Sequence, residues 1–150
     1  MSDTTLNYTV HDSLPPEAAI VDAGLGDANA AAAPLHEVQP LACIARRPGG
    51  EVVGGAVGRT WGIACELQQL WVDPAHRRCG IGAQLVREFE SRARARGCRT
   101  FYLETFSFQA PSLYRSLGYT ARLELHGFGH GIVKYTMVRE VEADAGKVGS

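Results

Sequence analysis

The spacing of hydrophobic residues predicts strands in the first part of the chain. Apolar side chains alternate in residues 5–10, and residues 41–45 and 51–58 are short apolar runs separated by a turn that contains proline and glycine. Alternation and short apolar runs bounded by turn residues are typical of β-strands. We therefore expect an edge strand at 5–10 and a hairpin at 41–58. The glycines of the second hairpin strand predict that another backbone passes close to it.

One helix is expected between the edge strand and the hairpin. Asp12 and Ser13 offer a helix cap ahead of two prolines, which a first helical turn tolerates. The helix should run to about Ala23, because residues 24–29 contain two glycines and predict a loop or a helix break. The alanine run that follows is expected to end at Pro34.

The middle of the chain has the pattern of a strand, a turn, a helix and a second strand. The apolar strand 63–72 ends at an Asp-Pro pair, and a basic, glycine-containing turn follows at 77–82. The next segment, up to Gly97, places apolar side chains on one helical face and charged ones largely on the other. With a further strand at 99–105, this order predicts two parallel strands joined by a right-handed helical crossover.

The last third predicts a short helix and a second hairpin. The helix carries Tyr114 and is capped by Gly118, and strands at 119–125 and 132–138 flank a glycine-rich loop. The residues from 141 onward are small and polar, and we expect them to fray. One domain over residues 1–140 with a flexible tail at 141–150 is the expected organisation, since 150 residues suit a single domain.

The turn before the long helix has the chemistry of a phosphate site. The first N–H groups of a helix lack intrahelical partners and carry partial positive charge. Gly80 and Gly82 let a bulky anion approach the backbone, and Arg77 and Arg78 add charge. The turn lacks both the Gly-Lys-Ser/Thr of a nucleotide-triphosphate loop and the third glycine of a dinucleotide fingerprint, where Leu85 stands. Those residues alone leave open a helix-opening turn that binds nothing.

Composition narrows the class of protein. The chain is 45% hydrophobic, enough for a sizeable core, and its net charge of −1 argues against nucleic-acid or membrane binding by the whole surface. The four cysteines form no Cys-x-x-Cys pair and lie beside no histidine in a zinc pattern, so we expect reduced thiols in a cytoplasmic protein. His126 and His130 could share a face only on a helix, which their glycine neighbours disfavour, and we expect no metal site.

Two motifs together resemble one family. Arg77-x-x-Gly80-x-Gly82, behind a strand, is similar to the acetyl-CoA motif of the GNAT acetyltransferase superfamily. A second segment, from Ala110 through Tyr114 to Gly118-Tyr119, resembles that family's Ala-x-x-x-Tyr-x-x-x-Gly-Phe/Tyr helix. The resemblance covers roughly residues 67–119.

This resemblance implies the GNAT fold, an α/β fold of the α+β type. Its sheet would be mixed but mostly antiparallel, with about six to seven strands, helices on both faces, and a splayed parallel pair formed by the fourth and fifth strands. The implied activity is direct transfer of an acetyl group from the co-substrate acetyl-CoA to a primary amine, in a ternary complex. The acceptor would be a small molecule that the sequence does not identify, and the family also suggests a homodimer through the last strands.

The resemblance assigns residues to each part of the site. Backbone groups of the fourth strand would hold the thioester arm, and the turn and helix start would hold the pyrophosphate. Many relatives have an asparagine where Ser107 stands, so the shorter serine leaves that contact open and Gln109 is the substitute. The implied cofactor-binding residues are Leu70, Trp71, Val72, Arg77, Arg78, Cys79, Gly80, Ile81, Gly82, Ala83, Ser107 and Gln109.

Tyr114 matches the family's tyrosine near the CoA sulfur and is the candidate acid for the leaving thiol, with a core packing role as the alternative. Deprotonation of the acceptor needs a base or a water chain, and Glu66 and Glu104 are both candidates. Each could equally be an exposed or salt-bridged carboxylate.

Three residues are candidates for binding the acceptor: Trp61, His126 and His130. For Trp61 the alternative is a place in the core, and for the histidines it is the surface. Two other functions stay open at this point, a CoA-binding sensor without turnover and a nucleotide-binding module that uses the same glycine turn.

Overall fold

The computed structural model describes residues 5–32 and 37–142 of the 150-residue chain. The chain divides into two compact units, 1–35 and 36–150, and each is described by itself. No helix in the described ranges is long and apolar enough to cross a membrane.

The described part of the first unit contains one helix and no strand, and it differs from the expected elements in two ways. Helix α1 (Ala18–Ala32) runs straight through Gly24 and Gly26, so the predicted end near Ala23 is wrong. Nothing lies within 4 Å of either glycine, and the alanines around them supply the helix propensity that offsets about 1 kcal/mol lost at each glycine. Residues 5–10 form no strand, because alternation alone supplies no partner for the backbone hydrogen bonds. The expected end of the helical region at Pro34 lies outside the described residues.

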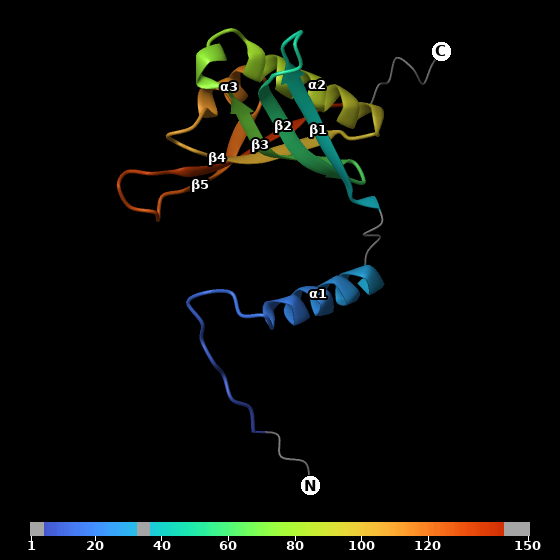
Figure 1. Cartoon of the computed structure of the whole chain (residues 1–150), viewed down its shortest axis with the longest axis vertical. Helices are drawn as coiled ribbons and strands as arrows, with labels where there is room; N and C mark the ends of the chain where they lie inside the picture. Colours follow the sequence, from blue (N-terminus) through green and yellow to red (C-terminus); the bar gives the residue numbers. More distant parts are fainter. Residues whose placement is uncertain (1–4, 33–36, 143–150) are drawn as a thin grey trace. The chain divides into compact units, whose positions relative to one another are not determined.

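The second unit is built on a six-stranded sheet with the order β1-β2-β3-β4-β6-β5 (Figure 1). All neighbours are antiparallel except β3 and β4, which are parallel. The sequence therefore predicted the class of sheet and the parallel pair correctly, with one strand too many at the start. The strands are β1 (Gln39–Arg46), β2 (Val52–Trp61), β3 (Ala64–Val72), β4 (Thr100–Phe106), β5 (Thr120–Leu125) and β6 (Lys134–Glu140).

A β-bulge in β3 is the feature that shapes the site. Val57 pairs with Gln69, but the next residue, Gly58, pairs with Leu67, so Gln68 is an extra residue in β3. A Cβ on Gly58 would lie 1.9 Å from the Glu66 carbonyl oxygen, so only glycine permits this close approach. The close backbone neighbour expected at the glycines of this strand is thus confirmed.

The bulge changes which side chains face the core. Cys65 and Leu67 are buried before it, whereas Leu70 and Val72 pack against the same core after it. Those positions are odd-numbered before the bulge and even-numbered after it, because one inserted residue shifts the two-residue period.

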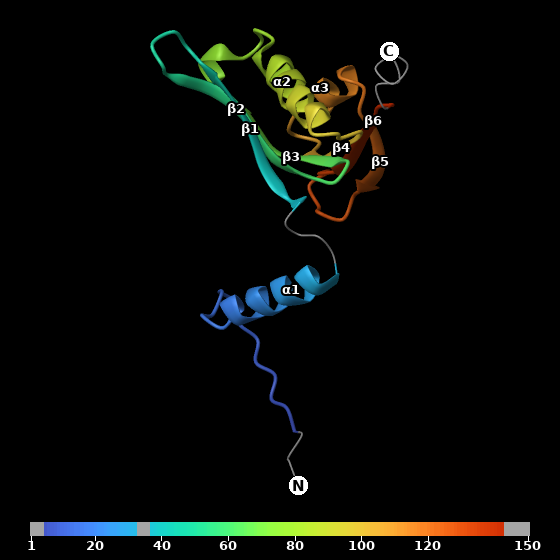
Figure 2. The ribbon, with the colours of Figure 1, turned by 90° about the vertical axis from the view of Figure 1, so that its right-hand side faces the viewer.

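Helices α2 (Ile81–Ala95) and α3 (Pro111–Ser116) lie on the same face of the sheet (Figure 2). Leu85 and Phe89 of α2 and Tyr114 of α3 belong to one buried cluster with the inward side chains of the strands. Helices on both faces stay a prediction, because α1 belongs to the other unit. Residue 141, where the tail was expected to begin, is hydrogen-bonded: its amide donates to the Arg99 carbonyl at 2.8 Å. The rest of the expected tail, residues 143–150, lies outside the described residues.

Candidate active site

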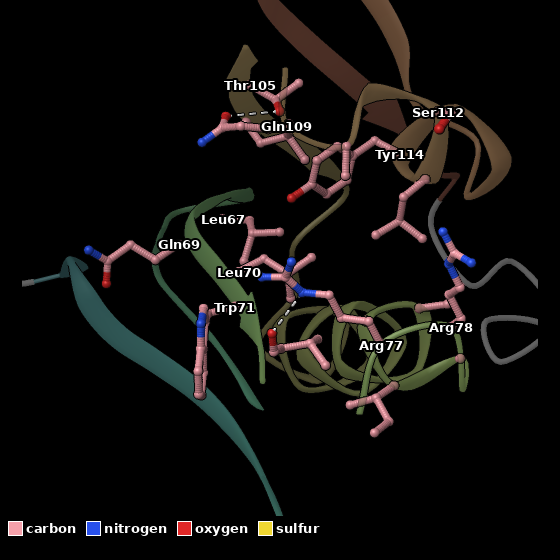
Figure 3. A pocket seen from close by; sticks show the side chains of 18 of the residues that line it. Leu67, Gln69, Leu70, Trp71, Arg77, Arg78, Thr105, Gln109, Ser112 and Tyr114 are labelled. Carbon is pink, nitrogen blue, oxygen red and sulfur yellow. Dashed lines mark hydrogen bonds between the residues drawn. The ribbon is translucent and has the colours of Figure 1, made fainter. Parts of the chain in front are cut away.

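An open cleft of about 1080 Å³ lies where β3 and β4 diverge (Figure 3). The two strands pair with each other only from Ala64↔Thr100 to Leu67↔Leu103. Beyond that point both strands continue, β3 paired with β2 and β4 paired with β6, but not with each other. The ladder therefore stops at the bulge, which twists β3 away from β4. β3 and β4 are thus the splayed parallel pair that the family resemblance implies for the expected fourth and fifth strands. Its walls are the second half of β3, the start of α2, the end of β4 and helix α3.

The divergence leaves backbone groups of β3 facing the cleft. The Asp73 amide donates to the Val53 carbonyl of β2 at 2.8 Å, so residue 73 faces β2. Because alternate residues of a strand direct their backbone groups to opposite sides, those of Leu70 and Val72 face the cleft. The Val72 carbonyl accepts a hydrogen bond from Arg77 Nε at 3.2 Å. An extended ligand placed beside β3 would find the donors and acceptors of an unpaired strand edge there.

The start of α2 faces the same cleft and has no side-chain cap. Gly80 has φ 77° and Arg78 has φ 65°, so two residues of the turn are left-handed. The first hydrogen bond of the helix runs from the Gln84 amide to the Gly80 carbonyl, which leaves the amides of residues 81–83 without partners inside the helix. This geometry and the helix dipole favour an anion.

Gly82 keeps the approach to these amides open. A Cβ at Gly82 would point toward Leu113 Cδ2 at 3.5 Å and Val72 Cγ2 at 3.8 Å, across the cleft wall. Arg77 and Arg78 line the cleft beside it, and the helix has no acidic residue in its first turn. The sequence missed His76, which also lines the cleft and whose Nδ1 lies 2.9 Å from Asp73 Oδ2. Its only sequence signal was the three-residue spacing from Asp73.

Tyr114 lies on α3 with its hydroxyl directed into the cleft (Figure 3). The residue is 7% exposed, and its ring packs edge-on against Tyr119 at a centroid distance of 6.0 Å. Burial raises the pKa of Tyr114 to about 12, because the phenolate would lose solvation. The hydroxyl therefore stays protonated at neutral pH and can donate a hydrogen bond.

Tyr119 binds a buried carboxylate behind Tyr114. Its hydroxyl donates to Glu90 Oε2 at 2.5 Å, and Arg139 donates to Glu90 Oε1 at 2.6 Å. Burial raises the pKa of Glu90, and burial together with the Glu90 charge raises that of Tyr119. This network joins Glu90 of α2 to Arg139 of β6 and to Tyr119, which lies in the connection between α3 and β5.

The segment after β4 brings Gln109 to the cleft but not Ser107. The Gln109 side-chain oxygen accepts from the Phe106 amide at 2.8 Å and from Thr105 Oγ1 at 3.2 Å. This arrangement closes the turn and leaves the side chain at the cleft wall. Ser107 instead accepts from the Val133 amide at 3.1 Å, which joins the turn to the segment before β6.

The two candidate bases differ in position. Glu104 lies in β4 beyond the end of the β3–β4 pairing, lines the cleft, and forms an ion pair with Lys134. Glu66 lies within the paired part, does not line the cleft, and is bound by Arg59 Nε at 3.0 Å. Glu66 pairs with Tyr102, so the two-residue period of a strand places Glu66 and Glu104 on the same face of the sheet. They differ because Glu66 lies before the point where β3 and β4 diverge and Glu104 lies after it.

Four further predicted site residues do not line the cleft: Trp61, Cys79, His126 and His130. The exposed Cys79 thiol lies 3.6 Å from the Arg77 carbonyl. His126 lies on the exposed hairpin loop, 4.0 Å from Glu124. In the same loop, the Phe128 ring contacts Phe106 of β4, and neither of these two rings lines the cleft. The other residues that the sequence did not single out are Leu67, Gln68, Gln69, Leu103, Thr105, Phe108, Ala110, Ser112 and Leu113.

All four cysteines of the chain are free thiols. No group of metal-binding side chains occurs among residues 5–32 and 37–142. The polar groups that line the cleft include backbone amides, two arginines, a tyrosine hydroxyl and a carboxylate.

Known proteins resemble this chain in sequence and in fold. The model of the acetyltransferase (GNAT) family matches residues 11–119. A blasticidin-S acetyltransferase of Streptomyces morookaense is 35% identical over 112 residues, which cover 72% of this chain and 82% of that protein. The crystal structure of an acetyltransferase from Bacillus cereus has a TM-score of 0.77 at 23% identity, over 89% of this chain and 98% of that one. A Bacillus anthracis protein solved with acetyl coenzyme A has a TM-score of 0.60 at 18% identity, over 69% and 63% of the two chains. The family match over most of its length shows that this chain belongs to the acetyltransferase (GNAT) family.

Proposed function

We propose that the protein transfers an acetyl group directly from acetyl-CoA to a primary amine of a small molecule, within a ternary complex. One observation carries this proposal. An uncapped, arginine-flanked helix start and a buried tyrosine hydroxyl face one cleft between two diverging strands.

The donor would use two surfaces of the cleft. The amides of residues 81–83, with Arg77 and Arg78, would bind the pyrophosphate, and the backbone groups of Leu70 and Val72 would pair with the amides of the pantetheine arm. Arg77 would then release the Val72 carbonyl that it binds in this structure. The fold shared with the Bacillus anthracis protein that holds acetyl coenzyme A supports this choice of donor.

Tyr114 would act as a hydrogen-bond donor to the leaving sulfur. A simple thiol has a pKa near ~8.5, about 3.5 units below that of Tyr114, so complete proton transfer from the tyrosine alone would cost about 5 kcal/mol. Donation without full transfer, or transfer as the attacking amine gives up its own proton, avoids that cost. A fixed donor directed at developing negative charge is an effective catalytic device in a partly dry cleft.

The acceptor must lose a proton before it attacks. An alkyl ammonium of pKa ~10.4 is almost wholly protonated at neutral pH, which corresponds to roughly 4 to 5 kcal/mol. We propose that Glu104, directly or through water, takes this proton, because it lines the cleft beyond the divergence point. Glu66 would serve only through a longer water chain, since Arg59 binds it outside the cleft lining.

Organisation and context follow as part of the same proposal. The family match spans both units of the chain, which supports one catalytic domain over residues 1–140. The blasticidin-S acetyltransferase relative supports a small-molecule acceptor rather than a macromolecule. We retain a cytoplasmic location and a homodimer as predictions.

A thiol-release assay with acetyl-CoA and a panel of primary amines tests the proposal. We expect thiol release that depends on both substrates and N-acetylated product by mass spectrometry. Calorimetry with acetyl-CoA, NAD and ATP provides the control for the donor. Tight binding of acetyl-CoA with no turnover over the whole panel would instead favour a sensor, and tighter binding of NAD or ATP would refute the choice of donor.

A further inference from the structure

Three phenylalanines form an aromatic cluster at one end of the cleft. The rings of Phe106 and Phe108 are stacked with centroids 5.3 Å apart and an interplanar angle of 14°. Phe128, from the loop between β5 and β6, meets Phe106 edge-on at 5.4 Å and 80°. Phe108 also lines the cleft, so the cluster is continuous with the candidate active site. We call Phe106, Phe108 and Phe128 the aromatic cluster.

The cluster leaves aromatic surface open to solvent. Phe108 is 67% exposed and Phe128 is 45% exposed, whereas Phe106 is covered by both of them. Phe108 and Phe128 each contact Phe106 and remain largely in solvent, so these two rings contribute little to the buried core. Such a surface is characteristic of a binding site for an apolar or aromatic group.

The sheet places this cluster opposite the phosphate site. In β4, Phe101, Leu103 and Thr105 are buried on the side of α2 and α3, so Glu104 and Phe106 alternate onto the other face. The gap between β3 and β4 connects the two faces. A donor bound at the α2 start therefore enters from the helix face, and an acceptor can reach the same gap from the face with the aromatic cluster.

An ammonium group and a carboxylate lie beside the aromatic cluster, those of Lys134 and Glu104. Lys134 forms an ion pair with Glu104, and its Nζ lies 5.9 Å from the centre of the Phe106 ring. A primary ammonium is thus held in this structure between a carboxylate and an aromatic ring. The Lys134 side chain is one-third exposed, so it can move to solvent when another ammonium approaches.

We propose that the aromatic cluster is the acceptor-binding subsite and selects amines that carry a flat aromatic ring. This inference rests on the proposed acetyl transfer and names the substrate class for it. The free faces of Phe108 and Phe128 would stack on the ring of the acceptor, and the Glu104 carboxylate would attract its ammonium toward the gap. The residues of this subsite come from β4, the turn after it, and the β5–β6 loop.

Two amines of nearly equal size test this directly. 2-Phenylethylamine and 2-cyclohexylethylamine carry the same primary ammonium on the same linker and differ in whether the ring is aromatic and flat. Aromatic pairing adds to the burial of area, so we expect kcat/KM to favour the phenyl compound by about 3- to 10-fold. Saturation-transfer NMR with the full-length protein gives the same comparison as binding, independently of turnover.

Two variants of one residue separate stacking from folding. Phe108→Leu keeps an apolar side chain but removes the aromatic face, and it should bring the phenyl-to-cyclohexyl ratio close to one. Phe108→Tyr keeps the face and should keep the ratio. Leu123→Ala, at an exposed position of β5 outside the cleft, is the control for general surface effects. Acetyl-CoA affinity should be unchanged in all three.

The outcomes distinguish this inference from the proposed function. Turnover of amines with a wild-type ratio near one, or a ratio that Phe108→Leu leaves unchanged, overturns the aromatic subsite while acetyl transfer stands. Preferential binding of the phenyl compound without turnover supports the subsite and counts against acetyl transfer. Failure of both amines to bind overturns the subsite. A shift from dimer to monomer in Phe108→Leu, with no change in the ratio, would assign the cluster to a second copy of the chain instead.

Discussion

A substitution at Gly82 tests whether the start of α2 binds the pyrophosphate of acetyl-CoA. The Cβ of any other residue here would point toward Leu113 and Val72 at ordinary contact distances of 3.5 and 3.8 Å. Alanine therefore fits without displacing its neighbours. The indole of Gly82→Trp would extend from the same point into the cleft that lies in front of the helix amides.

The expected loss follows from the donors that the indole would cover. The amides of residues 81–83 have no partners inside the helix, and a hydrogen bond to a charged group contributes about 1.5 to 3 kcal/mol. Loss of two of the three would cost about 3 to 6 kcal/mol, which weakens binding by about 10²- to 10⁴-fold. Gly82→Ala should change the Kd by less than about threefold and raise the free energy of unfolding by up to about 1 kcal/mol, since alanine is the better helix former.

Isothermal titration calorimetry with acetyl-CoA measures the affinity, and urea unfolding shows that both variants are folded. Gly80→Glu, with a carboxylate and a strained φ at the neighbouring cap, should lose binding as Gly82→Trp does. If folded Gly82→Trp bound acetyl-CoA with wild-type affinity, the diphosphate would lie elsewhere and the donor site described above would be wrong.

Three further predictions concern the tyrosine, the bulge and pH. Tyr114→Phe should lower kcat by roughly 10²-fold or more at unchanged acetyl-CoA affinity, because it removes only the hydroxyl; an unaltered kcat would exclude Tyr114 from the reaction. Gly58→Ala should destabilise the protein by about 3 kcal/mol or more in urea unfolding, since its Cβ would lie 1.9 Å from the Glu66 carbonyl oxygen. Gly55→Ala on the same strand should cost far less, because its Cβ would meet a flexible Ile44 methyl at 3.1 Å and the Cys43 carbonyl oxygen at an ordinary contact distance of 3.5 Å. The free energy of unfolding should fall as pH rises from 10 to 12, because Tyr114 has a pKa of about 12 in the folded state and about 10 in the unfolded state. The folded state therefore binds the proton more tightly, and its stability should fall by about 1 kcal/mol by pH 11. Tyr114→Phe should remove this loss of stability.

The start of α2 and the turn before it could be predicted from the sequence, because they depend on residues that are close together in the chain. A helix start needs glycines and positive charge within a few residues, and Arg77, Gly80 and Gly82 supply both in one turn. The apolar spacing of α2 likewise fixes which face is buried. The predicted end of α1 is wrong because Gly24 and Gly26 do not break the helix, which the alanines around them favour.

The aromatic cluster could not be predicted from the sequence, because it depends on contacts between distant segments. Phe128 meets Phe106 only because the β5–β6 hairpin folds back, and the glycines around Phe128 in the sequence do not show which side chain will contact β4. The chemistry of a histidine does not determine where its side chain lies, and the structure places His126 and His130 outside the cleft lining. Glu66 and Glu104 could not be separated without knowing where β3 leaves β4.

The bulge in β3 determines where the cleft begins. Its signal was present in the sequence, since the apolar positions of β3 change from odd to even across the pair Gln68-Gln69. That shift keeps Leu70 and Val72 in the core while the strand turns away from β4, so the fold loses little apolar burial when it gives up the pairing. The backbone groups released on that side are those that we propose bind the donor. A strand edge buried among protein atoms would be costly, whereas one that faces an open cleft is solvated until an extended ligand pairs with it. The same inserted residue therefore makes the cleft and supplies its polar wall.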